Sequence, residues 1–154
     1  MSKRGVFPGF ATVCLLGAAC GGDSGTGPTT SHHVAGNWLY RAWSMATGTG
    51  VVCTTPGPYM TLTQNNVVFA GTFVHDTIIC TSPSGPLGGT FASGDVLNAS
   101  ISGDSIRFDL RNSLWRNFGT FVTEDSVAGV VNADVLVEGS QRVLAGYWAA
   151  VRQP

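Results

Sequence analysis

The sequence predicts an all-β protein: an antiparallel up-and-down β-barrel of about eight to ten strands, preceded by a signal peptide and a flexible tether. Beyond Ser31, residues that favour turns (Gly, Asn, Asp, Ser and Pro) recur about every eight to twelve residues. The segments between them alternate apolar and polar side chains, and none carries a long apolar stripe with the helical period. Closing such strands into a barrel leaves no exposed strand edge.

Residues 1–19 have the layout of a secretory signal peptide. Lys3-Arg4 supplies a basic start, residues 6–16 form an apolar run, and the small residues 17–19 end it. The run is too short to span a bilayer comfortably. Pro8-Gly9 interrupts it, which argues against a buried first strand or helix.

The residues around Cys20 resemble a bacterial lipobox, in which a Leu-Ala-Gly-like triplet precedes a cysteine. Ala18, Ala19 and Cys20 match that pattern, whereas Gly17 departs from it because the bulky residue lies one place early, at Leu16. The resemblance implies cleavage before Cys20 and diacylation of this cysteine. An ordinary signal peptidase would also accept residues 17–19 and cut the same bond, so Cys20 with and without lipid both remain open.

The number of cysteines bears on the lipid and on a disulfide. Cys14 leaves with the signal peptide, so the exported chain keeps Cys20, Cys53 and Cys80. If Cys20 carries lipid, no odd thiol remains, because the other two can pair. Cys53 and Cys80 are predicted to form a disulfide that ties the loop after the first strand to a later strand. Metal binding by these two is a weaker alternative, since a closed zinc site needs four ligands.

We expect residues 20–33 to form a Gly/Ser/Thr-rich tether and residues 34–154 to form the barrel domain. Two acyl chains on Cys20 would suffice for stable anchoring, so the membrane is an expected partner. In lipoproteins, an Asp directly after the lipidated cysteine favours retention in the inner membrane. The resemblance, together with Gly21 at that position, therefore implies an outer-membrane lipoprotein of the cell envelope.

Composition excludes two classes of protein. The chain is 44% hydrophobic and only 11% charged, which excludes disorder driven by charge and low hydropathy. Lys3 is the only lysine, and beyond Arg4 the positive charges are scattered arginines that the acidic residues outnumber. The sequence therefore predicts no basic patch and no nucleic acid partner.

Two hairpins carry the clearest strand pattern. Residues 105–111 place apolar side chains on one face and charged side chains on the other, residues 96–101 alternate before them, and Ser102-Gly103-Asp104 supplies the turn. Residues 59–64 and 67–74 form the second hairpin around Asn65-Asn66, since Asn tolerates the positive φ of a tight turn. Further strands are expected over residues 37–44, 77–81, 88–92, 118–123, 127–137 and 143–151.

Gly36-Asn37-Trp38 resembles the G-x-W sequence at the start of the first strand of lipocalin-like and avidin-like barrels. The resemblance implies that Trp38 closes one end of the barrel against an arginine near the last strand; Arg152 is the best match and Arg142 the second. Residues 59–74 also resemble small β-barrel domains of bacterial surface lipoproteins. The sequence shows no further lipocalin motif and no recognisable biotin-binding set, so the resemblance implies a fold but no ligand.

No set of residues has the spacing of a catalytic or metal site. His32-His33 lies in the expected tether without a nearby set of carboxylates or cysteines. His75-Asp76 and Glu124-Asp125 have the position of solvated turns, and no serine or cysteine stands in a nucleophile context. There is no phosphate loop and no dinucleotide-binding fingerprint. We therefore expect no enzyme, no metal and no cofactor.

Aromatic residues are numerous for one small domain, and core packing accounts for most of them. Trp43 and Trp115 are expected at the mouth or rim of the barrel, because each stands where a strand gives way to a polar segment. Arg116, beside Trp115, would orient an anionic head group. The candidate ligand-binding residues are Trp43, Phe73, Phe108, Trp115 and Arg116.

Two functions are consistent with the sequence. The first is a membrane-anchored lipoprotein whose barrel binds a small apolar or amphipathic ligand, which requires a cavity lined by Phe, Tyr and Trp. The alternative is a structural or interaction lipoprotein with a solid barrel that docks an envelope protein partner through an exposed aromatic patch. The analogy with the barrel families favours the first.

Overall fold

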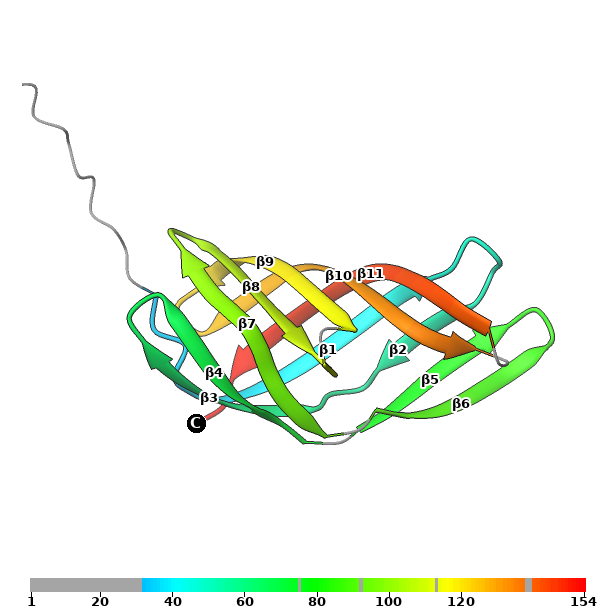
Figure 1. Ribbon diagram of the computed structural model, residues 1–154, viewed down its shortest axis with the longest axis horizontal. Coiled ribbons are helices and arrows are strands. Elements are labelled where there is room, and N and C mark those ends of the chain that lie inside the picture. The colour runs from blue at the N-terminus through cyan, green and yellow to red at the C-terminus, as the bar shows by residue number, and fades with distance from the viewer. Residues whose placement is uncertain (1–31, 75, 92, 113, 138–139) are drawn as a thin grey trace, which may run out of the picture.

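The computed structural model describes residues 32–154 except 75, 92, 113 and 138–139. The described residues form eleven strands and no helix (Figure 1). The strands are β1 Gly36–Ala46, β2 Val52–Thr55, β3 Tyr59–Asn65, β4 Val68–Phe73, β5 Asp76–Ser82, β6 Gly85–Phe91, β7 Gly94–Ser102, β8 Ser105–Leu110, β9 Trp115–Thr123, β10 Ser126–Val137 and β11 Ser140–Arg152. The expected signal peptide, Cys20 and most of the expected tether lie outside the described residues.

Eight strands close into an antiparallel barrel in the order β1-β3-β4-β7-β8-β9-β10-β11, and β11 pairs back with β1. The closing pair runs from Trp38 opposite Arg152 to Trp43 opposite Tyr147. Apart from the inserted strands β2, β5 and β6, neighbours in the barrel are neighbours in the chain, so the topology is up-and-down. The predicted fold class is confirmed, and both predicted hairpins are present as β3–β4 and β7–β8.

The strands β2, β5 and β6 form a side sheet that extends the barrel at one end (Figure 1). The side sheet exists because β1 has two neighbours along the same edge: Gly36–Leu39 pair with β3, and Ala42–Ala46 pair with β2. The β1–β2 pairing contains a bulge, within which Ser44 takes a φ of 51°. Strand β2 has no counterpart among the segments predicted from the sequence.

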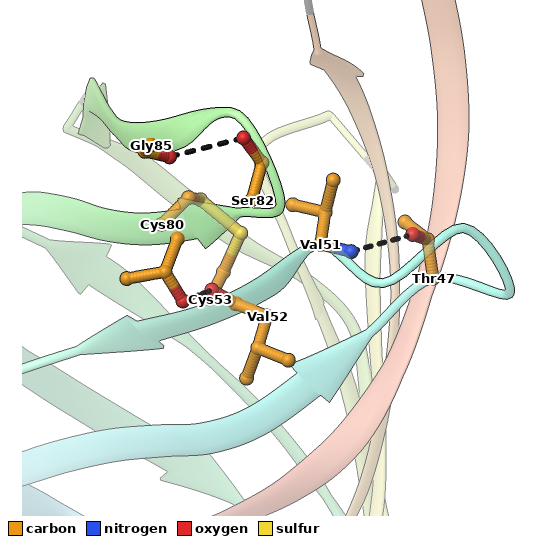
Figure 2. The surroundings of a disulfide bond; sticks show 8 residues. Thr47, Val51, Val52, Cys53, Cys80, Ser82 and Gly85 are labelled. Carbon is orange, nitrogen blue, oxygen red and sulfur yellow. Dashed lines mark hydrogen bonds between the residues drawn. A yellow bond between two sulfur atoms is a disulfide. The ribbon is translucent and has the colours of Figure 1, made fainter.

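The predicted disulfide is confirmed, and it crosslinks the side sheet. Cys53 on β2 and Cys80 on β5 are direct partners, their Cα atoms lie 4.0 Å apart, and both side chains are buried. Figure 2 shows the bond between the two strands, beside hydrogen bonds within the turns at Thr47–Val51 and Ser82–Gly85. The bond therefore joins two strands, whereas the sequence suggested a loop and a strand.

Side chains that alternate along the strands fill the barrel interior. On β1, Trp38, Tyr40 and Ala42 point inward and are at most 1% exposed. Trp148 stacks on Tyr40 with ring centres 5.7 Å apart and meets Phe108 edge-on at 5.0 Å. Because each large apolar side chain contributes about 1.5–3 kcal/mol when it is fully buried, this aromatic cluster is a main source of stability.

Two glycines permit close packing where Trp148 crosses β9 and β10. Gly119 on β9 and Gly129 on β10 are direct partners. A Cβ atom at Gly119 would lie 2.7 Å from Cζ2 of Trp148, and one at Gly129 would lie 2.0 Å from the carbonyl oxygen of Phe118. The indole N–H of Trp148 donates to the carbonyls of Phe118 and Val130 at 3.2 and 3.0 Å. Small residues therefore stand where the largest side chain of β11 crosses β9 and β10.

Residues His32–Ala35, which we name the strap, run across one end of the barrel before β1 begins. Val34 is 1% exposed and donates its N–H to Oε1 of Gln64. His32 is also buried and stacks on Phe121. The sequence places His32 in a flexible tether, whereas in the structure its ring packs on the barrel.

Candidate functional site

Trp38 and Arg152 pack against each other beside the strap, at one end of the barrel. The guanidinium carbon of Arg152 lies 4.6 Å from the centre of the Trp38 ring, a cation–π geometry, and Trp38 is 1% exposed. Arg152 also donates to the carbonyls of His33 and Ala35 in the strap. Arg152, the first of the two arginines that the resemblance to the barrel families implies, is therefore the one that packs on Trp38. Arg142, the second choice, instead lines a polar pocket with residues of the turns after β1 and β5.

The barrel interior next to Trp38 is tightly packed. The void there measures about 10 Å³, at the lower limit for one water molecule. Its walls are Val34, Trp38, Met60, Leu62, Ile106, Phe108, Val127, Trp148 and Ala150. Ligand pockets usually measure about 300–1,000 Å³, so this void does not hold a drug-sized ligand in the described conformation.

The candidate ligand-binding residues do not come together at one site. Phe73, Phe108 and Trp115 are core residues that are at most 3% exposed. Trp43 points outward from β1 and is 41% exposed. Arg116 also points outward, from β9. These five side chains therefore cannot line one cavity.

The rim position expected for Trp115 is wrong, because its side chain is 0% exposed. Trp115 is the first residue of β9, where it lies opposite Leu110 on β8 and Ala133 on β10. Ala133 and Leu110 are also 0% exposed, so all three side chains belong to the core. Arg116 follows on the opposite face, with its guanidinium 3.4 Å from the carboxylate of Asp134.

A neutral polar pair lies at the centre of the core. The hydroxyl of Tyr40 donates to Oδ1 of Asn117 at 2.8 Å, and both residues are 0% exposed. The amide nitrogen of Asn117 donates to the carbonyls of Phe108 and Trp115 at 3.3 and 3.2 Å. Burial raises the pKa of Tyr40 far above its usual range, because a phenolate would lose its hydration there. The pair links β1 to β9 and has a structural role.

The outer face of the barrel carries an apolar row across four strands. This outer row consists of Trp43 on β1, Tyr147 on β11, Val130 on β10 and Phe118 on β9, each opposite the next in the strand pairing. Their exposed fractions are 41%, 56%, 47% and 48%. With strands about 4.8 Å apart, the row is about 15 Å long. Figure 1 shows these four strands side by side.

Arginines flank the outer row on two sides. Arg107 on β8 is the direct partner of Phe118. Arg41 precedes Trp43 by two residues on β1 and therefore shares its outward face. Arg107 donates its Nε–H to the hydroxyl of Ser100 at 2.9 Å. Among the described residues, neither arginine forms a salt bridge.

A groove of about 440 Å³ lies beside Phe118 and Arg107. Its lining residues are Ser100, Ser102, Ser105, Ile106, Arg107, Phe118 and Gly119. An aromatic ring, serine hydroxyls and a guanidinium meet there. This combination suits an apolar group that carries a hydrogen-bond acceptor.

Of the outer row, the sequence predicts a functional role for Trp43 alone. Phe118, Val130 and Tyr147 are recognisable as apolar residues in predicted strands. That they lie opposite one another depends on the register of β9, β10 and β11, which the alternation within each strand does not reveal. The sequence does not reveal the groove either, because the groove joins residues of two separate hairpins.

No family model, no curated protein and no solved structure matches this chain. Among residues 32–154, with the gaps given above, no group of three or more His, Cys, Asp or Glu side chains could hold a metal ion. In the same part of the chain, no helix is long and apolar enough to cross a membrane.

Proposed function

We propose that this barrel is a non-catalytic interaction module that docks a protein partner through the outer row. The observation that carries the proposal is that Trp43, Tyr147, Val130 and Phe118 are contiguous in cross-strand register and 41–56% exposed. Single exposed apolar residues are ordinary, whereas a contiguous patch marks an interaction site. Tryptophan, tyrosine and arginine are also the residues that dominate protein interfaces.

The partner segment is expected to have an apolar centre with acidic residues on its flanks. Arg41 and Arg107 lie beside the outer row, and carboxylates opposite them would steer the encounter and set the orientation of the partner. The groove beside Phe118 has room for one large side chain of that segment. A row about 15 Å long corresponds to about three turns of a helix or to one short strand.

The packing of the interior favours docking over the binding of a small ligand. The void beside Trp38 measures about 10 Å³. The aromatic side chains that would line a larger cavity, Phe73, Phe108 and Trp115, instead pack in the core. To admit a ligand at this place, a core side chain would have to leave.

We also propose that the protein is exported by the signal peptide of residues 1–19 and anchored in the cell envelope by lipid on Cys20. Support comes from the resemblance of residues 16–20 to a lipobox. The disulfide adds support, because it pairs Cys53 with Cys80 and leaves Cys20 as the remaining cysteine of the exported chain. Disulfides are themselves typical of exported proteins. The expected partner is therefore another protein of the envelope.

The test combines capture in the envelope with reconstitution. The full-length protein is crosslinked in its own envelope, the partner is identified and purified, and its Kd is measured for each variant. The double variant Trp43→Ala/Tyr147→Ala removes two large aromatic side chains from the outer row and should raise the Kd by about 30-fold or more. Arg107→Gln should raise the Kd by about tenfold. Tyr59→Ala is the matched control, since Tyr59 is as exposed as Tyr147 at 56% but lies on β3.

Two outcomes would contradict the proposal. An unchanged Kd for the Trp43→Ala/Tyr147→Ala variant would exclude the outer row as the docking surface. A native mass spectrum of the extracted protein with a small molecule retained in the barrel would support the ligand-binding function instead. The denatured mass from the same sample tests separately for acyl chains on Cys20.

A further inference from the structure

His32 fixes the strap to the barrel, and its ring lies between two carboxylates. Nε2 is 2.9 Å from Oδ1 of Asp104, and Nδ1 is 3.4 Å from Oε1 of Glu124. The ring stacks on Phe121 with the two centres 3.8 Å apart and the planes 8° apart. Asp104 belongs to the turn between β7 and β8, and Glu124 to the turn between β9 and β10. One side chain therefore links the strap to two hairpins.

The chemistry of the imidazole ring makes this arrangement sensitive to protonation. A neutral imidazole has one N–H and one lone pair, so it can donate to only one of the two carboxylates. When Nε2–H donates to Asp104, the lone pair of Nδ1 faces an oxygen of Glu124, and two acceptors then oppose each other. Only the imidazolium ion donates at both nitrogens. We propose that His32 is an acid-sensitive clasp, which closes the strap when it is protonated and loosens it when the Nδ1 proton leaves to solvent.

The clasp would control how tightly the closed end of the barrel is sealed. The N–H of Val34 donates to Oε1 of Gln64 at 2.5 Å, and its carbonyl accepts the indole N–H of Trp38 at 2.8 Å. Val34 also forms part of the wall of the apolar void beside Trp38. Because Val34 follows His32 by two residues, loosening of His32 weakens these bonds first.

The remaining charges nearby limit the size of the effect. Asp125, next to Glu124, accepts a hydrogen bond from Nε of Arg152 at 2.7 Å, and Arg152 holds the carbonyls of His33 and Ala35. These contacts do not depend on His32, so the strap should loosen rather than detach. The side chains of Asp104 and Glu124 are 71% and 72% exposed, so each contact is expected to have the strength of a surface ion pair.

The experiment is a pH series of nuclear magnetic resonance spectra on the ¹⁵N-labelled full-length protein. The ring nitrogens of His32 report protonation and tautomer directly. Hydrogen exchange of the Val34 amide and the Trp38 indole, corrected for intrinsic rates, reports opening of the strap. Between one acidic and one alkaline pH value we expect the opening constant to rise by about two- to fivefold, in step with the change in the His32 ring-nitrogen signals.

Two variants separate the clasp from a purely steric role. In Glu124→Gln, the amide can donate to the neutral ring and accept from the charged ring, so the strap should stay protected and its pH response should flatten. His33→Gln, which changes the exposed neighbouring histidine, should leave the wild-type response unchanged. Equal protection of the wild type at both pH values, or a full response in Glu124→Gln, would overturn the proposal. None of these outcomes depends on the outer row.

Discussion

Reduction of the Cys53–Cys80 disulfide should destabilise the whole barrel rather than the side sheet alone. The two cysteines are 27 residues apart in the chain, and the closed loop between them contains the barrel strands β3 and β4. On the chain-entropy model, a crosslink of this length contributes about 3.5 kcal/mol to the free energy of unfolding at 25 °C. For a domain of this size, each kcal/mol changes the melting temperature by about 3–5 °C, so the expected loss is roughly 10–18 °C.

The assay is guanidinium unfolding of oxidised and reduced protein, followed by tryptophan fluorescence. Trp38, Trp115 and Trp148 are at most 1% exposed, so their emission should respond strongly to unfolding. Because Cys53 is 0% and Cys80 8% exposed, reduction is carried out on unfolded protein that is then refolded. Free energies of unfolding that agree within about 0.5 kcal/mol would refute the reasoning, since the crosslink would then not restrict the unfolded chain in the way the model requires.

The core supplies three more predictions, each measured by denaturant unfolding. Asn117→Ala should lower the free energy of unfolding by about 1–3 kcal/mol, because the Tyr40 hydroxyl loses its buried acceptor. The double variant with Tyr40→Phe should lose less stability than the sum of the two single losses. Strict additivity of the losses would count against a coupled pair. Burial raises the pKa of Tyr40, so stability should be complete below about pH 10 and fall at higher pH, where the unfolded chain releases a proton that the folded protein retains. Tyr40→Phe should reduce that fall, and an unchanged slope would contradict the assignment. Gly129→Ala should lower the free energy of unfolding by more than about 2 kcal/mol, because the new Cβ would lie 2.0 Å from the Phe118 carbonyl oxygen. Gly48→Ala is the control: no atom lies within 4 Å of its new Cβ, so its stability should stay within about 0.5 kcal/mol of wild type. Similar losses for the two variants would contradict the packing argument.

Local features of this fold could be predicted from the sequence, whereas features that depend on long-range pairing could not. The turns at Asn65-Asn66 and Ser102-Gly103-Asp104 contain their own signal, and Asn66 and Gly103 both take a φ of 56°. Strand β2, by contrast, has four residues and is followed by Pro56-Gly57. It is a strand because β1 and β5 lie on its two sides, which the segment itself does not reveal.

Trp43 and Trp115 show the same limit for the candidate site. In the sequence they look alike, since each adjoins a polar segment. In the structure Trp43 occupies an outward position of β1 and Trp115 an inward position of β9. Whether the side chain of a strand residue points inward or outward depends on the register of strand pairing. For β9, that register is determined by its partners on β8 and β10. Adjacency to a polar segment therefore does not predict which of the two tryptophans reaches solvent.

The same register that builds the core also builds the outer row. Trp148 lies opposite Gly129, and Gly129 lies opposite Gly119, so this alignment brings the indole to Gly119, where a Cβ atom would lie 2.7 Å from it. The residues one place away, Tyr147, Val130 and Phe118, are then forced into line on the outside. A slip of one residue in any of these strands would turn its side chains over and lose both features.

This coupling determines which variants are informative about function. Gly129→Ala would disturb the core and the outer row together, so a loss of partner binding in that variant would not identify the surface. Truncation of Trp43 or Tyr147 removes side chains that are 41% and 56% exposed and leaves the glycine and Trp148 packing in place. A variant truncated at Trp43 or Tyr147 that has the denaturant midpoint of the wild type but no longer binds the partner would therefore assign the function to the outer face of the barrel.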